Sequence, residues 1–214
     1  MYRHATRQTL STLLLLSAAS AGATGITVQV QDAGGKALAD TVVYVEPESG
    51  AASGRAPATA EIEQKGLKFM PLVSVVQTGA KIFFPNNDKV RHHIYSFSPA
   101  HKFDQKLYSG QSATPQVFDK AGTVVLGCNI HDKMLAYVKI VDTPYFAKTD
   151  AAGAARIELP AGGTYVVKAW HYNTVGGATP EQMVTVKAGE APASAAFRLP
   201  MKPVVADDPS SSTL

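Results

Sequence analysis

The sequence predicts an all-β protein, and three observations carry this prediction. Short runs rich in β-branched and aromatic residues, among them 92–99, 122–128 and 135–142, each close at Gly, Pro, Asn or Asp. Apolar and polar residues alternate over 26–47, on both sides of a Gly-containing turn. No stretch after residue 23 keeps a long 3.6-residue periodicity. We therefore expect an antiparallel β-sandwich or barrel.

The N-terminus has the pattern of a cleaved secretory signal peptide over residues 1–23. Arg3 and Arg7 form a basic head, residues 10–19 form a short apolar run, and small residues of the A-x-A type follow. The apolar run is shorter than the ~20 residues that a membrane span needs, and no later stretch reaches that length. We expect a periplasmic protein with no membrane span after cleavage.

The charge of the chain argues against a nucleic-acid partner. The full sequence carries 20 Lys and Arg against 17 Asp and Glu. Cleavage removes Arg3 and Arg7 but no acid, so the remaining chain is close to neutral. A nucleic-acid-binding protein needs a strongly basic face, which this balance does not supply.

The pattern of strands and turns divides the chain after the signal peptide. We predict a first β-domain over 24–142, interrupted by a Gly/Ala/Ser/Pro-rich loop at 48–60. The "DTPYF" stretch at 142–146 marks a boundary, and 143–201 repeats the strand-turn pattern as a second, small β-sandwich. The polar segment 202–214 is predicted to be a disordered tail.

The stretch "CNIHDKM" contains the only cysteine of the chain, Cys128, with His131 and Met134 at three-residue intervals. A single cysteine in an exported protein forms no internal disulfide, so a metal ion or burial should protect the thiol. A thiolate, imidazoles and a thioether together form a soft ligand set that favours copper. A loop between the strands at 122–128 and 135–142 can direct all three side chains to one point. The alternative is a buried thiol beside incidental histidines.

A further imidazole has to come from another part of the fold. His92 and His93 begin a predicted strand directly after "PNND", where either ring can face the cysteine loop. Because side chains alternate along a strand, one of the two should point inward and the other away. His101, in the insert before the cysteine loop, is expected to be exposed rather than a ligand, and His171, beside the only Trp, is expected to be structural or part of an interaction surface.

These residues resemble a known family, the cupredoxins or small blue copper proteins. The C-x-x-H-x-x-M spacing is similar to the amicyanin loop, and "NNDKVRHHI" resembles the stretch around the family's first histidine ligand. The span 62–142 is similar to periplasmic cupredoxin-like proteins labelled methylamine utilisation proteins. The C-terminal part resembles carboxypeptidase-regulatory, or transthyretin-like, β-sandwiches. The resemblance implies a Greek-key β-sandwich followed by that smaller sandwich.

The same resemblance implies a metal site with one copper ion, held by His92, Cys128, His131 and Met134. His93 stands where most members have an Asn that hydrogen-bonds to the cysteine loop, so the resemblance implies that it supports this loop or is an alternative ligand; the other possibility is a surface imidazole with no role at the site. The implied function is electron transfer between redox protein partners as copper cycles between Cu(I) and Cu(II).

The sequence does not favour an enzyme. A binuclear copper centre needs a second cysteine, and multicopper oxidases need H-x-H motifs, which do not occur. Two other functions stay open. One is copper storage or delivery, and the other is a β-rich scaffold or binding protein with a structural copper site.

Overall fold

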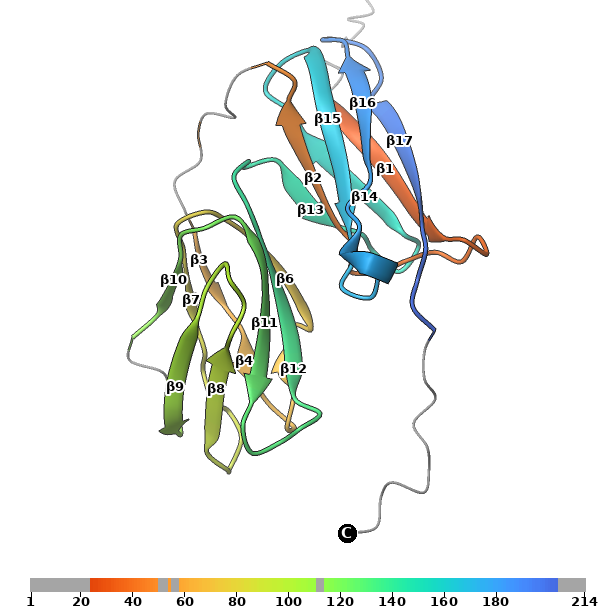
Figure 1. Cartoon of the computed structure of the whole chain (residues 1–214). Helices are drawn as coiled ribbons and strands as arrows, with labels where there is room; N and C mark the ends of the chain where they lie inside the picture. Colours follow the sequence, from red (N-terminus) through yellow and green to blue (C-terminus); the bar gives the residue numbers. More distant parts are fainter. Residues whose placement is uncertain (1–23, 50–53, 55–57, 111–113, 204–214) are drawn as a thin grey trace, which may run out of the picture.

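The computed structural model describes residues 24–49, 54, 58–110 and 114–203, and this part of the chain is all-β. It contains seventeen strands and a single 3-10 turn, Val175–Gly177. The strands form two units, which lie one above the other in Figure 1. The predicted signal peptide, 1–23, lies outside the described residues, as do residues 204–214 of the predicted tail, 202–214. Lys202, at the start of that tail, is held in place, because its amide donates to the Asn173 carbonyl at 2.9 Å. Within the described residues, no helix is long and apolar enough to cross a membrane.

The first unit, here called the central unit, comprises residues 58–142. Its larger sheet has the order β6-β12-β11-β8-β9, a smaller sheet has the order β10-β7-β3, and β4 pairs with β5. The strands are β3 (Thr59–Glu61), β4 (Glu63–Gln64), β5 (Phe69–Met70), β6 (Val73–Gln77), β7 (Ala80–Phe83), β8 (His92–Ser96), β9 (Phe103–Tyr108), β10 (Gln116–Phe118), β11 (Gly122–Cys128) and β12 (Leu135–Val141). Most pairs are antiparallel, but β12 with β6 and β3 with β7 are parallel.

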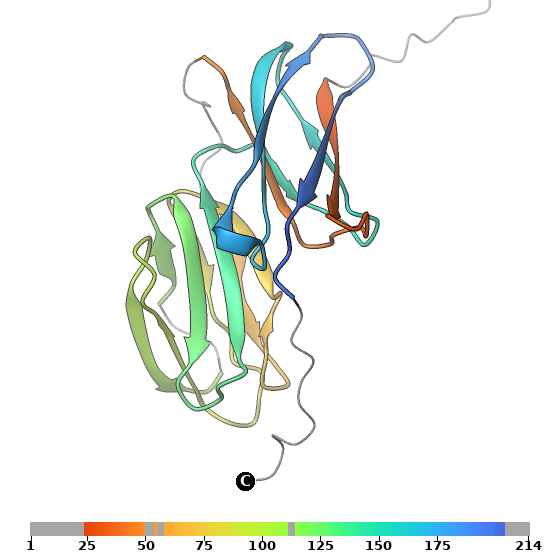
Figure 2. The ribbon, with the colours of Figure 1, turned by 45° about the vertical axis from the view of Figure 1, so that its right-hand side comes forward.

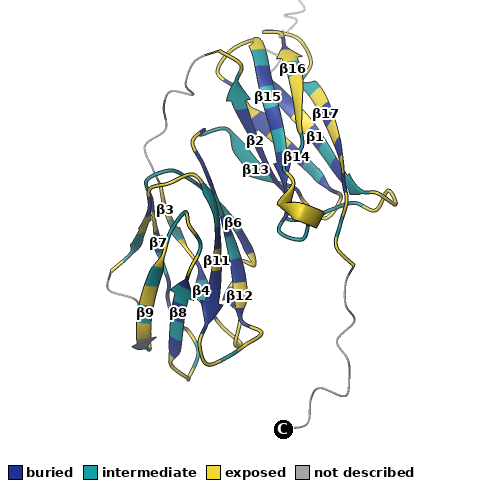
Figure 3. Ribbon diagram, in the orientation of Figure 1, coloured by how far each residue is buried: buried dark blue, intermediate teal, exposed yellow. Residues whose placement is uncertain are grey.

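The core of the central unit lies between these two sheets. Period-2 alternation along β8 and β11 turns Ile94 and Leu126 inward, where they are fully buried with Phe84 and Phe118. Figure 3 shows the C-terminal end of β11 as buried, whereas the loops beyond it are largely exposed. The loops that join β7 to β8 and β11 to β12 lie at the end of this unit remote from the other unit (Figures 1 and 2).

The second unit, here called the terminal unit, is built from both ends of the described chain. One sheet has the order β14-β1-β17 and the other β13-β2-β15-β16, and a single apolar core joins them. The strands are β1 (Gly25–Asp32), β2 (Val42–Pro47), β13 (Phe146–Lys148), β14 (Ala154–Glu158), β15 (Gly163–Trp170), β16 (Glu181–Val186) and β17 (Ala193–Leu199). The unit is therefore a β-sandwich of its own.

The strand pairing corrects the predicted domain boundaries, 24–142 and 143–201. β1 pairs with β14 and in parallel with β17, and β2 pairs with β13 and β15. Residues 24–47 thus belong with the C-terminal strands, and the central unit is inserted between β2 and β13. Alternation in a sequence predicts that a segment is a strand, but it does not identify the partner strand.

A small aromatic cluster joins the two units. Tyr44 and Trp170 of the terminal unit are buried against Val73 and Val141 of the central unit. The ammonium group of Lys139, on β12, lies 5.7 Å from the ring centre of Tyr44 and 5.5 Å from that of Trp170. Cation–π contacts of this kind contribute about 0.5 to 2 kcal/mol as they become desolvated.

Candidate metal centre

Cys128 is the last residue of β11 and points into the core of the central unit. Val124, Leu126 and Cys128 occupy alternate, inward-facing positions on this strand, and the thiol-bearing residue is 4% exposed. Burial restricts access of oxidants to the sulfur. The structure therefore confirms the expectation that the lone thiol is protected by burial.

His92 is the first residue of β8 and faces Cys128. Ile94 on β8 pairs directly with Cys128, so the imidazole two residues earlier lies on the same inward face of the sheet. The ring is fully buried, and its Nδ1 atom lies 3.7 Å from Cys128 Sγ. His92 is thus the inward-facing member of the His92–His93 pair.

His131 approaches the thiol from the loop between β11 and β12. Its Nδ1 atom lies 3.6 Å from Cys128 Sγ, and its ring centre lies 5.0 Å from that of His92, at an interplanar angle of 61°. A turn in which the Met134 amide donates to the His131 carbonyl, at 2.9 Å, shapes this loop. His131 is only partly buried, so one edge of the site reaches the surface.

The three side chains fit a transition-metal ion. The sulfur and the two ring nitrogens lie within 4.8 Å of one another, and no other such group of His, Cys, Asp and Glu occurs in the described residues. Metal–ligand distances of about 2.0 to 2.3 Å, as in zinc–nitrogen and zinc–sulfur bonds, separate neighbouring ligands of a trigonal plane by roughly 3.6 Å. The two sulfur–nitrogen distances of 3.6 and 3.7 Å match that spacing.

Met134 is buried in the same apolar cluster as Cys128, with 1% of its surface exposed. Burial beside the thiol is compatible with a fourth, axial ligand, but it is equally expected of a core methionine. The role of Met134 as a metal ligand stays a prediction.

Asp88 contacts the far side of the His92 ring, a relationship that the sequence analysis missed. Its Oδ2 atom lies 2.8 Å from His92 Nε2. The Gly66 amide donates to Oδ1 and the Leu67 amide donates to Oδ2. An ionised carboxylate only accepts hydrogen bonds, so Nε2 carries the proton and Nδ1 presents its lone pair to the thiol. The available signal was an acidic residue four positions before the predicted ligand.

The electrostatics of Asp88 agree with this assignment. Partial burial raises the pKa of the carboxyl, but the hydrogen bonds from His92, Leu67 and Gly66 outweigh it and hold the pKa below its ordinary value. Asp88 therefore stays ionised at neutral pH. It provides a negative charge behind the His92 imidazole.

The loop that carries Asp88 is itself fixed by Asn86. The buried Asn86 side chain donates to the carbonyls of Val90 and Tyr108, both at 2.9 Å, and accepts from the Asp88 amide at 3.0 Å. Tyr108 donates to the Phe84 carbonyl, and burial raises the pKa of its phenol to about 12. A hydrogen-bonded frame thus presets the position of His92.

His93 lies on the opposite face of the sheet. Its ring contacts the carboxylate of Asp104. Its backbone carbonyl accepts a hydrogen bond from the Asn129 amide, at 3.1 Å. The ring was predicted to reach the cysteine loop as a second-shell group or an alternative ligand. In the structure it is the backbone of His93 that contacts this loop.

The other two histidines considered from the sequence lie away from the trio. His101 is partly buried rather than exposed, because its ring packs 4.5 Å from the ring centre of Phe118. His171 is buried in the terminal unit and stacks on Tyr172, and its Nδ1 accepts from the Asn173 amide. These contacts of His171 agree with a structural role.

No protein-family model and no curated protein sequence matches this chain. Solved copper proteins are similar over less than half of it. A purple cupredoxin from Nitrosopumilus maritimus has 20% identity and a TM-score of 0.34, covering 38% of this chain and 99% of its own. A reduced Cu(I) form of an amicyanin variant has 18% identity and a TM-score of 0.36, and the match covers 46% of this chain and 98% of the amicyanin chain. A copper-containing nitrite reductase from Thermus scotoductus has 20% identity and a TM-score of 0.37, and the match covers 45% of this chain and 25% of the reductase chain. These TM-scores are all below 0.5, so the chemistry of the site has to be argued from its own geometry.

Proposed function

We propose that the chain is a periplasmic type 1 copper protein that carries single electrons between redox partners. The observation that supports this proposal is the buried thiol of Cys128 with two imidazole Nδ1 atoms at 3.6 and 3.7 Å. Two imidazoles and a thiolate with a weak thioether ligand are the donor set of blue copper electron-transfer sites. Copper bound there supplies a one-electron couple between Cu(I) and Cu(II).

Each residue of the site has a role in this proposal. Cys128 supplies the anionic sulfur, and His92 and His131 supply the imidazole nitrogens. Met134 is proposed as the weak axial ligand. Asp88 orients His92, and the frame around Asn86 holds this ligand in place whichever oxidation state is bound. A preset site of this kind keeps rearrangement on electron transfer small, which suits a carrier rather than an enzyme.

His131 is the proposed exit for the electron. It is the partly exposed member of the trio, whereas Cys128 and His92 are buried. Its imidazole edge is therefore the shortest route from the site to a partner at the surface.

Copper storage or delivery is the second candidate function. The partly exposed His131 lies on a loop rather than a strand, and an exposed ligand on a loop also suits exchange of the metal with a partner or chelator. A purely structural copper site is the least favoured, because a ligand at the surface adds little to a core that is already packed.

Addition of Cu(II) to the purified protein tests the proposal. We expect an intense visible band from the thiolate, lost in both Cys128→Ser and His92→Ala. His101→Ala is the matched control, since it removes an imidazole of the same unit outside the trio, and it should keep the band. A colourless protein, or a band unaffected by Cys128→Ser, contradicts the proposal.

Electrochemistry and metal exchange separate the two candidate functions. A reversible one-electron wave with fast self-exchange supports the electron carrier, whereas ready transfer of Cu(I) to a chelator supports copper delivery.

A further inference from the structure

Three loops surround the two imidazoles at the end of the central unit remote from the terminal unit. They are 65–68, 87–91 and 129–133, here called the metal-end loops. Asp88 joins the first two through its bonds with Gly66 and Leu67, and His92 directly follows the second. His131, on the third, contacts Cys128. These contacts place all three loops at one surface.

That surface is apolar at its centre. Leu67, Val90 and Ile130 of these loops, and Leu135 beside them, are each between 43% and 48% exposed. Single exposed aliphatic residues need no explanation, but a cluster of four around one partly exposed ligand is characteristic of an interaction site.

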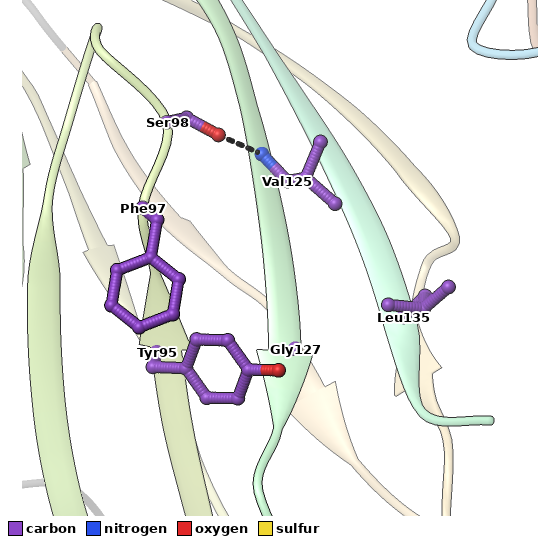
Figure 4. A pocket seen from close by; sticks show the side chains of 6 residues that line it. All are labelled: Tyr95, Phe97, Ser98, Val125, Gly127 and Leu135. Atoms are coloured by element: carbon purple, nitrogen blue, oxygen red, sulfur yellow. Dashed lines mark hydrogen bonds between the residues drawn. The ribbon is translucent and has the colours of Figure 1, made fainter. Parts of the chain in front are cut away.

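A shallow groove extends this apolar surface along the outer face of the larger sheet. Tyr95, Phe97, Ser98, Val125, Gly127 and Leu135 line it, and its volume is about 280 Å³ (Figure 4). Phe97 is 78% exposed, an unusual position for a phenyl ring. The Tyr95 ring lies over Gly127, the residue before Cys128, so closely that a Cβ there would stand 2.8 Å from the ring. The groove floor is thus the backbone next to the thiol-bearing residue.

The rim of this surface is basic. The metal-end loops carry Lys65, Lys68, Lys89, Arg91 and Lys133, all exposed, against only two carboxylates, Asp88 and Asp132. Of these two, Asp88 is already hydrogen-bonded to His92 and to two backbone amides. On the flanking strands, Glu63 accepts from Asn87 and lies 4.0 Å from the ammonium group of Lys65, and Asp104 contacts His93. In the rest of the chain after residue 23, acidic residues outnumber basic ones.

We infer that the partner at this surface is an acidic redox protein, whose carboxylates pair with the basic rim while its own apolar surface covers the centre and the groove. This inference rests on the proposed function, because a redox partner is expected only of an electron carrier. The attraction of this surface for anions can nevertheless be tested without electron transfer. Complementary charges steer association and can raise the on-rate by roughly 10- to 1,000-fold at low salt. Because acidic residues outnumber basic ones in the rest of the chain after residue 23, the excess of positive charge lies on the metal-end loops, where it can attract an anionic partner.

The first experiment maps the surface without any electron transfer. The redox-inert paramagnetic anion hexacyanochromate(III) is added to the metal-free, ¹⁵N-labelled protein at an ionic strength of about 10 mM, where the Debye length is roughly 30 Å. We expect the amides of the metal-end loops to broaden first, and the effect to vanish at about 1 M salt. Broadening that centres on another part of the molecule overturns the inference.

Charge-reversal variants make this experiment specific. Lys89→Glu/Arg91→Glu should remove most of the broadening, and Lys65→Glu/Lys68→Glu, on a different loop, should do the same. Lys120→Glu is the matched control: it is exposed in the same unit, but it precedes β11 and so lies at the opposite end from Cys128. Equal broadening in the Lys89→Glu/Arg91→Glu and Lys120→Glu proteins contradicts the inference.

The second experiment compares an acidic with a basic c-type cytochrome as partner. With the acidic protein we expect line broadening of the metal-end loops and, for the copper-loaded chain, electron transfer about tenfold slower in 0.15 M salt than at 10 mM. Faster reaction with the basic cytochrome overturns the inference while the carrier function stands. Binding of the acidic cytochrome without any electron transfer leaves the surface assigned and refutes the carrier function instead.

Discussion

Asp88 and His92 form a carboxylate–imidazole pair, with Oδ2 of the first 2.8 Å from Nε2 of the second. The opposite nitrogen of the ring lies 3.7 Å from Cys128 Sγ, so the carboxylate and the thiol hold the two ends of one imidazole. Because Asp88 also accepts from two backbone amides, its own position is fixed. The pair therefore sets which nitrogen of a buried histidine is free to bind a metal.

Replacing Asp88 by Asn should weaken Cu(II) binding by about 10- to 100-fold, because the imidazole loses the negative charge that strengthens it as a donor. The affinity for Cu(II) should fall more than the affinity for Cu(I), so the reduction potential should rise. Competition with a chelator and voltammetry measure the two effects, and ¹⁵N NMR of the metal-free protein reports the His92 tautomer. Asp132→Asn, an exposed carboxylate of the cysteine loop, is the control, and equal effects from the two variants would contradict this role.

His93→Asn should leave copper binding almost unchanged, since the His93 ring faces Asp104 and only its backbone carbonyl contacts the cysteine loop. We expect a change in unfolding free energy within about 0.5 kcal/mol, as for other partly exposed positions. His92→Ala, one residue away, should abolish the site. Visible spectra and urea denaturation of both variants make the comparison, and loss of the visible band in His93→Asn would show that the rings had been assigned to the wrong roles.

Gly127→Ala should destabilise the protein by about 1 to 3 kcal/mol, the usual cost of overpacking. The added methyl would stand 2.8 Å from Cζ and 2.9 Å from Oη of Tyr95, so the ring has to leave the sheet face. In a Tyr95→Ala background the same change should be neutral or stabilise by about 0.5 to 1 kcal/mol, because Gly is costly within a strand. A double-mutant cycle measured in urea tests this coupling, and strict additivity would refute it.

His171 should make stability fall as the pH drops. Burial lowers the pKa of His171 below its ordinary value of 6.5, although the nearby Asp40 carboxylate partly offsets this. As the pH falls through 6.5, the unfolded chain takes up a proton at this residue before the folded chain does. The free energy of unfolding therefore decreases, until the pH passes below the folded-state pKa. His171→Phe keeps an aromatic ring against Tyr172 and should show a shallower decrease between pH 8 and 5 than the unsubstituted protein. Identical pH profiles would contradict the assignment.

Much of the site was predictable because its chemistry is local. The spacing of Cys128 and His131 on one loop between two strands, and a histidine at a strand start, were enough to anticipate three residues that the structure brings together. Alternation also predicted that only one of His92 and His93 faces inward. Asp88 was missed because its role depends on the path of the loop after β7, which the side chain of Asn86 determines.

The assignment of strands to units was not predictable in the same way. The segment 26–47 was expected to form strands on both sides of a turn, and β1 and β2 are found there, but their partners begin more than one hundred residues later. Their alternation suits any sandwich with an apolar core. Only the full set of pairings shows that β1 packs beside β17 rather than on the central unit.

The insertion of the central unit between β2 and β13 has a consequence for the order in which the chain folds. Every strand of this unit is contiguous in sequence, whereas β1 must wait for β14 and β17 before its sheet exists. Contacts between nearby segments form faster than those that close long loops. As the polypeptide emerges progressively, the central unit can thus complete its fold and bring His92, Cys128 and His131 together before the strands β14 to β17 are available to complete the sheets of the terminal unit.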